Sequence, residues 1–235
     1  MNKEELETLL KDDFKIENEE IFKKLFLYFN LLISYNESVN LTTITDFEDV
    51  YIKHFYDSLL LSKTIDLTTR QSLLDIGSGA GFPGMVLKIV YPNLDVTLVE
   101  STGKKCLFLN QVIKELDLKD IKVVNERAEE YISNNRESFD IVTARAVSRL
   151  NILLELTIPY LKIGGFGAYL KSSNVQEEIN EATSTSRVLR STLFNINEFN
   201  LPLNKGERTI VIYQKNNKTN PIYPRKYSNI KNKPL

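Results

Sequence analysis

The sequence has few of the residues from which metal centres and nucleophilic sites are built. It contains one cysteine, Cys106, and one histidine, His54, among 235 residues. A single cysteine excludes a disulfide scaffold, and the scarcity of both residue types argues against zinc and iron sites, which draw on clusters of them. We therefore expect no metal, and Ser-His-Asp chemistry would depend on His54 alone.

Long apolar runs are also missing from the chain. No stretch approaches the roughly 20 apolar residues that a membrane span needs, and the first 20 residues are charged rather than apolar. The composition is otherwise that of a folded globular chain, with 42% hydrophobic and 26% charged residues. We expect a soluble, cytoplasmic protein that does not contact membranes, and we expect it to be a monomer.

The net charge of −1 hides an uneven distribution along the chain. Residues 1–20 hold eight acids against three lysines, whereas residues 215–235 hold six bases and no acid. A basic tail of this kind is either a solvated, partly disordered end or a contact for phosphate groups.

Apolar spacing divides the chain into a helical part and a part in which strands and helices alternate. Residues 17–35 repeat apolar side chains at i, i+3 and i+4, which predicts an amphipathic helix, and Asp46 is a candidate cap for a second helix. The expected organisation is a helical segment packed on the core over 1–68, an α/β core over 69–215 and the basic tail over 216–235. Strands are expected at 72–76, 95–100, 121–125, 139–145, 165–171 and 208–215. Helical stretches between most of them predict a doubly wound, Rossmann-like parallel sheet whose ligands bind at the carboxyl ends of the strands.

The strongest local signal is a glycine-rich turn between the first strand and the following helix, which reads DIGSGAGFPG over residues 75–84. Glycines let the backbone turn tightly and let a ligand approach the peptide closely. Two registers compete. Gly79, Gly81 and Gly84 fit a dinucleotide fingerprint, whereas a count from Gly77 gives G-x-G-x-G with Asp75 two residues before it.

Two carboxylates bear on the choice between these registers. Glu100 ends the next strand, where a carboxylate can accept hydrogen bonds from the ribose hydroxyls of either kind of nucleoside cofactor. Asp75 would repel a pyrophosphate but suits the positively charged sulfonium or ammonium of S-adenosylmethionine. The charge favours the methyl donor, while a nicotinamide dinucleotide and the absence of a cofactor stay open.

Seven ordered motifs resemble the class I S-adenosylmethionine-dependent methyltransferases and, within them, the ribosomal RNA small-subunit methyltransferase G family, also called glucose-inhibited division protein B. The motifs are Asn40-Leu41-Thr42, His54-Phe55-Tyr56-Asp57-Ser58-Leu59, the loop over 75–84, Val99-Glu100-Ser101, Arg127-Ala128-Glu129-Glu130, Thr143-Ala144-Arg145-Ala146-Val147 and Tyr223-Pro224-Arg225-Lys226.

The resemblance implies a Rossmann-like methyltransferase sheet with an N-terminal helical extension. It also implies transfer of a methyl group to N7 of a guanine in the 16S rRNA of the small ribosomal subunit. Residues expected to contact the cofactor are Asp75, Gly77, Gly79, Phe82, Glu100, Ser101, Ala128, Glu129 and Arg145. Arg145 and Lys171 are expected to position the reactants, and no dedicated base is expected, because the N7 lone pair needs no deprotonation.

Two other functions stay open on the sequence alone. The Gly79 register is compatible with an NAD-type oxidoreductase, although no proton-transfer pair is evident beside the single imidazole of His54. The basic tail is compatible with a non-catalytic RNA- or nucleotide-binding module.

Overall fold

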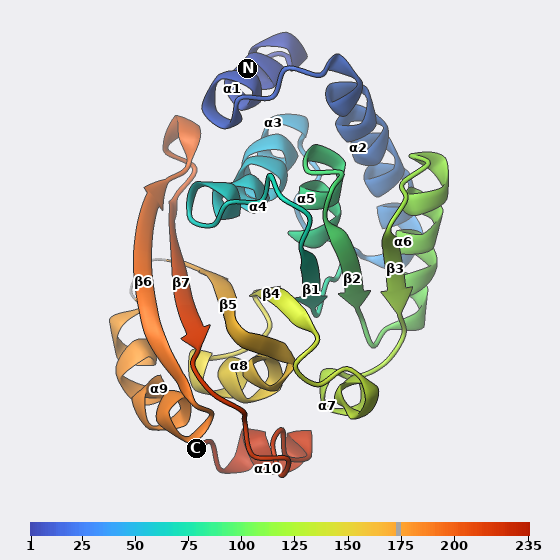
Figure 1. Cartoon of the computed structure of the whole chain (residues 1–235). Coiled ribbons are helices and arrows are strands. Elements are labelled where there is room, and N and C mark those ends of the chain that lie inside the picture. Colours follow the sequence, from blue (N-terminus) through green and yellow to red (C-terminus); the bar gives the residue numbers. More distant parts are fainter. Residues whose placement is uncertain (173–174) are drawn as a thin grey trace.

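A seven-stranded mixed sheet runs through the centre of the molecule, with the strand order β3-β2-β1-β4-β5-β7-β6 (Figure 1). The structure is a computed structural model that describes residues 1–172 and 175–235. The strands are β1 (Ser72–Ile76), β2 (Asp95–Val99), β3 (Ile121–Val124), β4 (Phe139–Arg145), β5 (Leu161–Lys171), β6 (Ser191–Asn200) and β7 (Glu207–Lys215).

The expected doubly wound sheet is confirmed for the first five strands, which pair in parallel. The last strand, β7, was expected to be parallel as well, but it lies antiparallel to β5. Strand β6 was not predicted. It is an edge strand with most of its residues exposed, so it has no buried face and no apolar alternation to reveal it.

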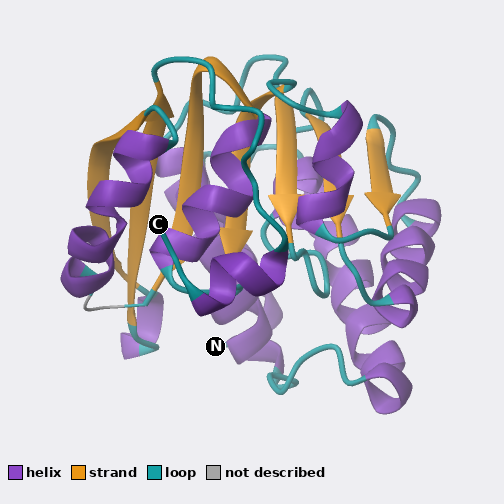
Figure 2. Ribbon diagram, turned by 90° about the horizontal axis from the view of Figure 1, so that it is seen from below, coloured by secondary structure: helices purple, strands orange, loops and turns teal. Residues whose placement is uncertain are grey.

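Helices cover both faces of the sheet (Figure 2). Those before the first strand are α1 (Lys3–Phe14), α2 (Glu19–Val39), α3 (Phe47–Val50) and α4 (Asp57–Leu59), with a π-helical stretch, Tyr51–Tyr56, between the last two. Those within and after the sheet are α5 (Gly84–Val90), α6 (Gly103–Glu115), α7 (Ala128–Tyr131), α8 (Leu150–Thr157), α9 (Gln176–Val188) and α10 (Tyr227–Asn232). Asn174, at the beginning of the helical stretch expected over 174–190, lies outside the described residues.

The alternation of side chains along the strands builds two hydrophobic cores. Leu73 packs in one core with residues of α1, α2, α5 and α6, while the adjacent Leu74 packs in the other with residues of α8 and α9. Both leucines are fully buried. The N-terminal helices therefore share a core with one face of the sheet, because successive side chains of a strand point to opposite faces.

Local sequence signals explain how this N-terminal segment is laid out. The Asp46 carboxylate accepts a hydrogen bond from the Asp49 N–H at 3.0 Å, which confirms the predicted cap. Helix α2 packs on α5 and α6, and the Tyr28 hydroxyl donates to the carbonyl of Ala80 inside the glycine loop. The first helices thereby hold the loop from behind.

The basic tail is folded against helices α8 and α9 rather than extended. Arg225 donates from its backbone N–H, Nε and Nη2 to the fully buried carboxylate of Glu155 in α8. Ile230 is buried, and the carbonyl oxygen of Leu235 accepts from the Thr185 hydroxyl at 2.7 Å. The expectation of a partly disordered end is thus wrong for this segment, which buried contacts hold at several points.

Candidate functional site

The carboxyl ends of β1, β2 and β4 meet at one edge of the sheet, at the point where the order of the chain reverses. Strand β1 lies between β2 and β4, and its last residue, Ile76, is opposite Val99. The Gly77 and Ser78 N–H groups donate to the Val99 carbonyl at 2.8 and 3.2 Å. This is the place where open α/β sheets bind their ligands.

Three glycines of the loop adopt left-handed backbone conformations. The φ angles of Gly77, Gly79 and Gly81 are 70°, 59° and 102°, values that L residues other than glycine rarely adopt. A Cβ on Gly77 would also lie 2.7 Å from Cγ2 of Val147, in the loop after β4. The glycine motif is therefore required both for the turn and for the narrow space beside it.

The loop forms one wall of a pocket that opens beside the ends of β1 and β2. The pocket is lined by Ile76, Gly77, Val99, Glu100, Ser101, Glu126, Arg127, Ala128, Glu129, Val147 and Leu156. Five residues expected to contact a cofactor are thus brought together: Gly77, Glu100, Ser101, Ala128 and Glu129. The pocket combines apolar walls with carboxylates, which suits a nucleoside better than a phosphate.

Glu100 is fixed by the backbone around it. Its Oε1 accepts from the Thr102 N–H at 2.7 Å and its Oε2 from the Gly79 N–H at 3.0 Å. The side chain is 6% exposed. Because each carboxylate oxygen carries two lone pairs, both oxygens can accept a further hydrogen bond from a ligand hydroxyl. Gly79, which does not line the pocket, acts here by orienting Glu100.

Asp75 lies beneath the loop instead of in the pocket lining. Its Oδ2 accepts from the Gly84 N–H at 2.9 Å, and its buried Oδ1 has no hydrogen-bond partner within the described part of the chain. Burial raises the pKa of the Asp75 carboxyl to about 7, against the opposing effects of the Gly84 N–H and Arg145. An unsatisfied buried oxygen of this kind is costly unless a ligand donor or cation pairs with it.

Arg145, at the end of β4, is held by the N-terminal helices. Its Nη1 donates to the Lys53 carbonyl at 3.0 Å and to Asp57 Oδ2 at 2.9 Å, and its Nη2 donates to Nδ1 of His54 at 3.2 Å. The guanidinium also lies 5.0 Å from the ring centre of Phe82. Nε–H and one Nη2 hydrogen have no acceptor among residues 1–172 and 175–235, so two donors are left for a ligand.

His54 is a neutral imidazole with both nitrogens engaged. Nδ1 lies 3.2 Å from Nη2 of Arg145 and 3.1 Å from the Lys53 carbonyl oxygen, and Nε2 lies 2.9 Å from Thr42 Oγ1. Burial and the positive charge of Arg145 lower the pKa of His54 to about 3. The ring stacks on Phe82, with centroids 4.4 Å apart. His54 and Phe82 therefore pack together behind Arg145, outside the pocket lining.

Asp57 joins two arginines that are distant in the sequence. The side chain is fully buried, and Oδ1 accepts from Nε of Arg208 at 2.5 Å while Oδ2 accepts from Arg145. Arg208 is the second residue of the antiparallel strand β7, and its role was not predicted. The signal that could have revealed it is a cation at the beginning of an otherwise apolar strand.

Lys171, at the end of β5, is also paired within the protein. Its Nζ lies 2.7 Å from Glu178 Oε2 and donates to the Ser148 carbonyl at 3.0 Å. Lys171 thus connects the loop after β4 to the first turn of α9. Its expected role in positioning reactants would act through this loop.

Two kinds of feature are not found in the part of the chain that the structure describes. No three histidine, cysteine or acidic side chains there are arranged to hold a metal ion. No described helix is both long and apolar enough to cross a membrane. Cys106 is buried, and its thiol lies 3.1 Å from the Glu100 carbonyl.

Comparisons with known proteins identify one family. The profile of the family described as "GidB: rRNA small subunit methyltransferase G" matches residues 21–211. Ribosomal RNA small subunit methyltransferase G of Staphylococcus epidermidis is 48% identical over 209 residues, covering 88% of this chain and 87% of that protein. The Staphylococcus aureus protein of the same name is 45% identical over 216 residues, covering 91% and 90%.

Solved structures agree on the fold. A SAM-dependent methyltransferase from Aquifex aeolicus superposes with a TM-score of 0.57 at 16% identity, covering 74% of this chain and 97% of that one. The YcgJ protein of Bacillus subtilis has the same TM-score at 15% identity, covering 70% and 100%. At these identities the likeness extends to the architecture alone.

Proposed function

The chain belongs to the ribosomal RNA small subunit methyltransferase G family, and we propose that it transfers the methyl group of S-adenosylmethionine to N7 of a guanine in 16S rRNA at the pocket beside Gly77 and Glu100. The observation that carries the proposal is the coincidence of family membership with a pocket of apolar walls and carboxylates at the carboxyl edge of the sheet. The NAD-type alternative has no support from the family, and the non-catalytic alternative does not explain the intact glycine loop.

The residues present fit the methyl donor. Ile76, Val99 and Leu156 supply apolar walls for a flat base, and Ala128 leaves room beside them. Glu100 offers two fixed oxygens to the ribose hydroxyls. The unsatisfied Oδ1 of Asp75 supplies negative charge near the cationic end of the donor. Gly77 keeps the strand end open to the ligand.

When bound, S-adenosylmethionine would supply an electrophilic methyl carbon, which the N7 lone pair of guanine attacks from the side opposite the sulfur as the C–S bond breaks and S-adenosylhomocysteine leaves. The protein needs no base for this step, and the state of His54 agrees with that, because burial and the charge of Arg145 lower its pKa to about 3. Alignment of the two reactants is the main source of rate in such a site.

We propose that Arg145 and Lys171 provide this alignment from the β4 and β5 ends. Two donors of Arg145 have no acceptor among the described residues, and four contacts hold its guanidinium in place. Lys171 fixes the loop after β4 through Ser148. The target guanine must be in a loop or turned out of its stack, because the N7 edge of an RNA helix lies in a groove that side chains cannot enter.

The substrate implied by the family is small-subunit rRNA, and we propose that the protein acts on it as a cytoplasmic monomer.

The ionisation of Asp75 predicts a pH-dependent affinity for the donor. Its pKa is about 7 in the ligand-free protein, and only the ionised form attracts a cation. Affinity for S-adenosylmethionine should therefore rise with pH, by about tenfold between pH 6 and pH 8, as the ionised fraction increases. Calorimetric titrations at these two pH values measure the change.

The control for this effect is Asp75→Asn, which keeps an oxygen for the Gly84 N–H but has no charge to lose. Titration of the ligand itself affects both proteins equally, so the difference between them isolates Asp75. An equal pH dependence in wild type and Asp75→Asn would contradict the placement of the cation near this carboxylate.

The function is tested with radiolabelled S-adenosylmethionine and small ribosomal subunits from cells that lack this gene. We expect about one methyl group per small subunit and none on large subunits, since the family description specifies small-subunit rRNA. Label on large subunits alone, or none on either, would refute the proposal.

A further inference from the structure

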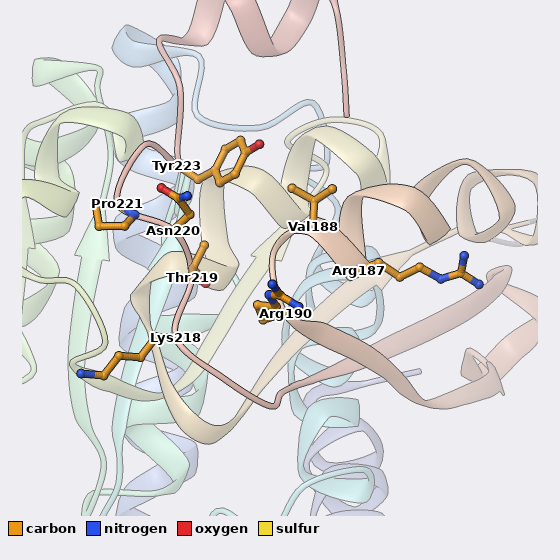
Figure 3. Close-up of a pocket in the computed structure, with 8 residues that line it drawn as sticks. All are labelled: Arg187, Val188, Arg190, Lys218, Thr219, Asn220, Pro221 and Tyr223. Atoms are coloured by element: carbon orange, nitrogen blue, oxygen red, sulfur yellow. The ribbon is translucent and has the colours of Figure 1, made fainter.

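A hollow lined by basic side chains lies where the C-terminal segment crosses the corner between α9 and β6 (Figure 3). We call it the basic hollow. Its lining consists of Arg187, Val188, Arg190, Lys218, Thr219, Asn220, Pro221 and Tyr223, and its volume is about 590 Å³. Three of these residues are cations and none is an acid.

The three cations of the basic hollow are exposed and have no ion-pair partner in the described part of the chain. Neighbouring bases differ in this respect. Lys215 pairs with Glu137 at 3.1 Å, and Arg225 pairs with Glu155. Ion pairing within the protein thus accounts for the paired bases, whereas the three cations of the basic hollow keep their charges free of a carboxylate among the described residues.

The backbone around the basic hollow is held in place. The Asn216 N–H donates to the Arg190 carbonyl at 2.9 Å, and the buried Thr219 hydroxyl donates to the Leu189 carbonyl at 3.0 Å. Nη2 of Arg136 donates to the carbonyl oxygens of Pro221, at 3.3 Å, and Tyr223. A ligand would therefore meet a surface that does not have to be ordered on binding.

The arrangement of the cations suits a chain of charges better than a single anion. Arg190 lies between the other two, while Lys218 and Arg187 point to opposite sides of it (Figure 3). Three separated cations match the successive phosphates of a nucleic-acid backbone, each of which carries one negative charge.

The charge distribution of the whole molecule points the same way. The acid-rich first helix and the basic C-terminal segment lie at opposite ends of the fold (Figure 1). A chain with a net charge of only −1 therefore has a basic end, and a polyanion is drawn to that end before contact.

The basic hollow is separate from the pocket at the carboxyl edge of the sheet. At that edge, Lys171 of β5 is the register partner of Thr209, near the beginning of β7. Lys215, beside the hollow, is the register partner of Ser191 at the other end of β7. Thr209 and Lys215 are six residues apart along β7, which places the two ends of the strand about 20 Å apart.

We propose that the basic hollow is a second rRNA contact, which binds the phosphate backbone of the substrate while the guanine occupies the pocket beside Gly77. The inference rests on the proposed function and assigns it a docking surface. The hollow would add affinity for the ribosomal substrate without altering the affinity for S-adenosylmethionine.

The test compares two triple variants with the same loss of charge. R187Q/R190Q/K218Q removes the cations of the basic hollow, and K114Q/K119Q/K122Q removes three exposed lysines at the β3 edge. Binding of each protein to 16S rRNA is measured by filter retention over a series of KCl concentrations. The midpoint of thermal unfolding and the Kd for S-adenosylmethionine report whether each variant is folded.

We expect the slope of log Kd against log salt to fall by about 2 to 3 for the hollow variant, with an affinity loss of at least about tenfold at low salt. The KM for small subunits should rise, while kcat and the Kd for S-adenosylmethionine stay the same. The edge variant should resemble wild type. A single charge reversal, Lys218→Glu, should weaken rRNA binding in the same direction.

An unchanged salt slope, or equal losses in both triple variants, would overturn the inference. The inference would also be overturned if the hollow variant lost binding of inorganic phosphate but kept the wild-type salt dependence of rRNA binding. The hollow would then bind a small anion. Absence of methylation by the wild type would refute the proposed function instead, so the two failures are distinguishable.

Discussion

Gly77→Val is expected to abolish binding of S-adenosylmethionine while leaving the chain folded. A Cβ at this position lies 2.7 Å from Val147, and the added methyl groups would occupy the space between the loop and the wall of the pocket. We expect the Kd measured by calorimetry to rise by more than about 100-fold, which corresponds to about 3 kcal/mol.

Gly164→Val is the matched control. Gly164 has a similar left-handed φ, 87°, but a Cβ there meets no atom within 4 Å. Both substitutions place a β-branched residue in a strained backbone conformation, and only Gly77→Val adds the contact with Val147, so Gly164→Val shows the effect of the backbone strain alone. Wild-type affinity in Gly77→Val would show that the ligand lies elsewhere.

Asp57→Asn is expected to destabilise the protein by about 3–5 kcal/mol, because it leaves two arginines without their shared counter-charge in a buried site. Asp57 is fully buried, and the side chains of Arg145 and Arg208 are only 16% and 20% exposed. The free energy of unfolding in urea measures the loss. Methylation should fall as well, since Arg145 loses the partner that orients it.

Asp117→Asn is the control for this loss. Asp117 pairs with Lys119 on the surface, where both side chains are more than 70% exposed. Exposed pairs contribute at most about 1 kcal/mol, so this variant should unfold almost as wild type. If Asp57→Asn lowered the free energy of unfolding by less than about 1 kcal/mol, the contacts of Asp57 with Arg145 and Arg208 would not join the N-terminal helices to the sheet.

The elements that could be predicted from the sequence are those that carry a buried face. Strands β1 and β4 have the predicted bounds, because their apolar runs end at polar or glycine residues. Strand β6 carries Phe194 and Ile196 on its exposed surface and is defined by its backbone pairing with β7. The direction of β7 depends on β6, because the chain turns back from β6 and β7 then pairs antiparallel with both β6 and β5. Local patterns in the sequence therefore showed neither the strand β6 nor the direction of β7.

The candidate site divides along similar lines. Gly77 and Glu100 follow directly after strands, and Ala128 begins the helix after β3, so a local motif and the rule that strand ends meet were enough to bring them together. The contacts of Arg145 and Arg208 with Asp57 span 88 and 151 residues. Such pairings depend on the packing of the N-terminal helices, which no spacing in the sequence specifies.

The central claim is tested most directly by identifying the modified nucleoside. Small subunits from cells that lack this gene are treated with the purified protein and labelled S-adenosylmethionine, and the 16S rRNA is digested to nucleosides. We expect the label in 7-methylguanosine at one position, and none with Gly77→Val. Label in any other nucleoside, or no label with a wild-type protein that binds the donor, would contradict the account.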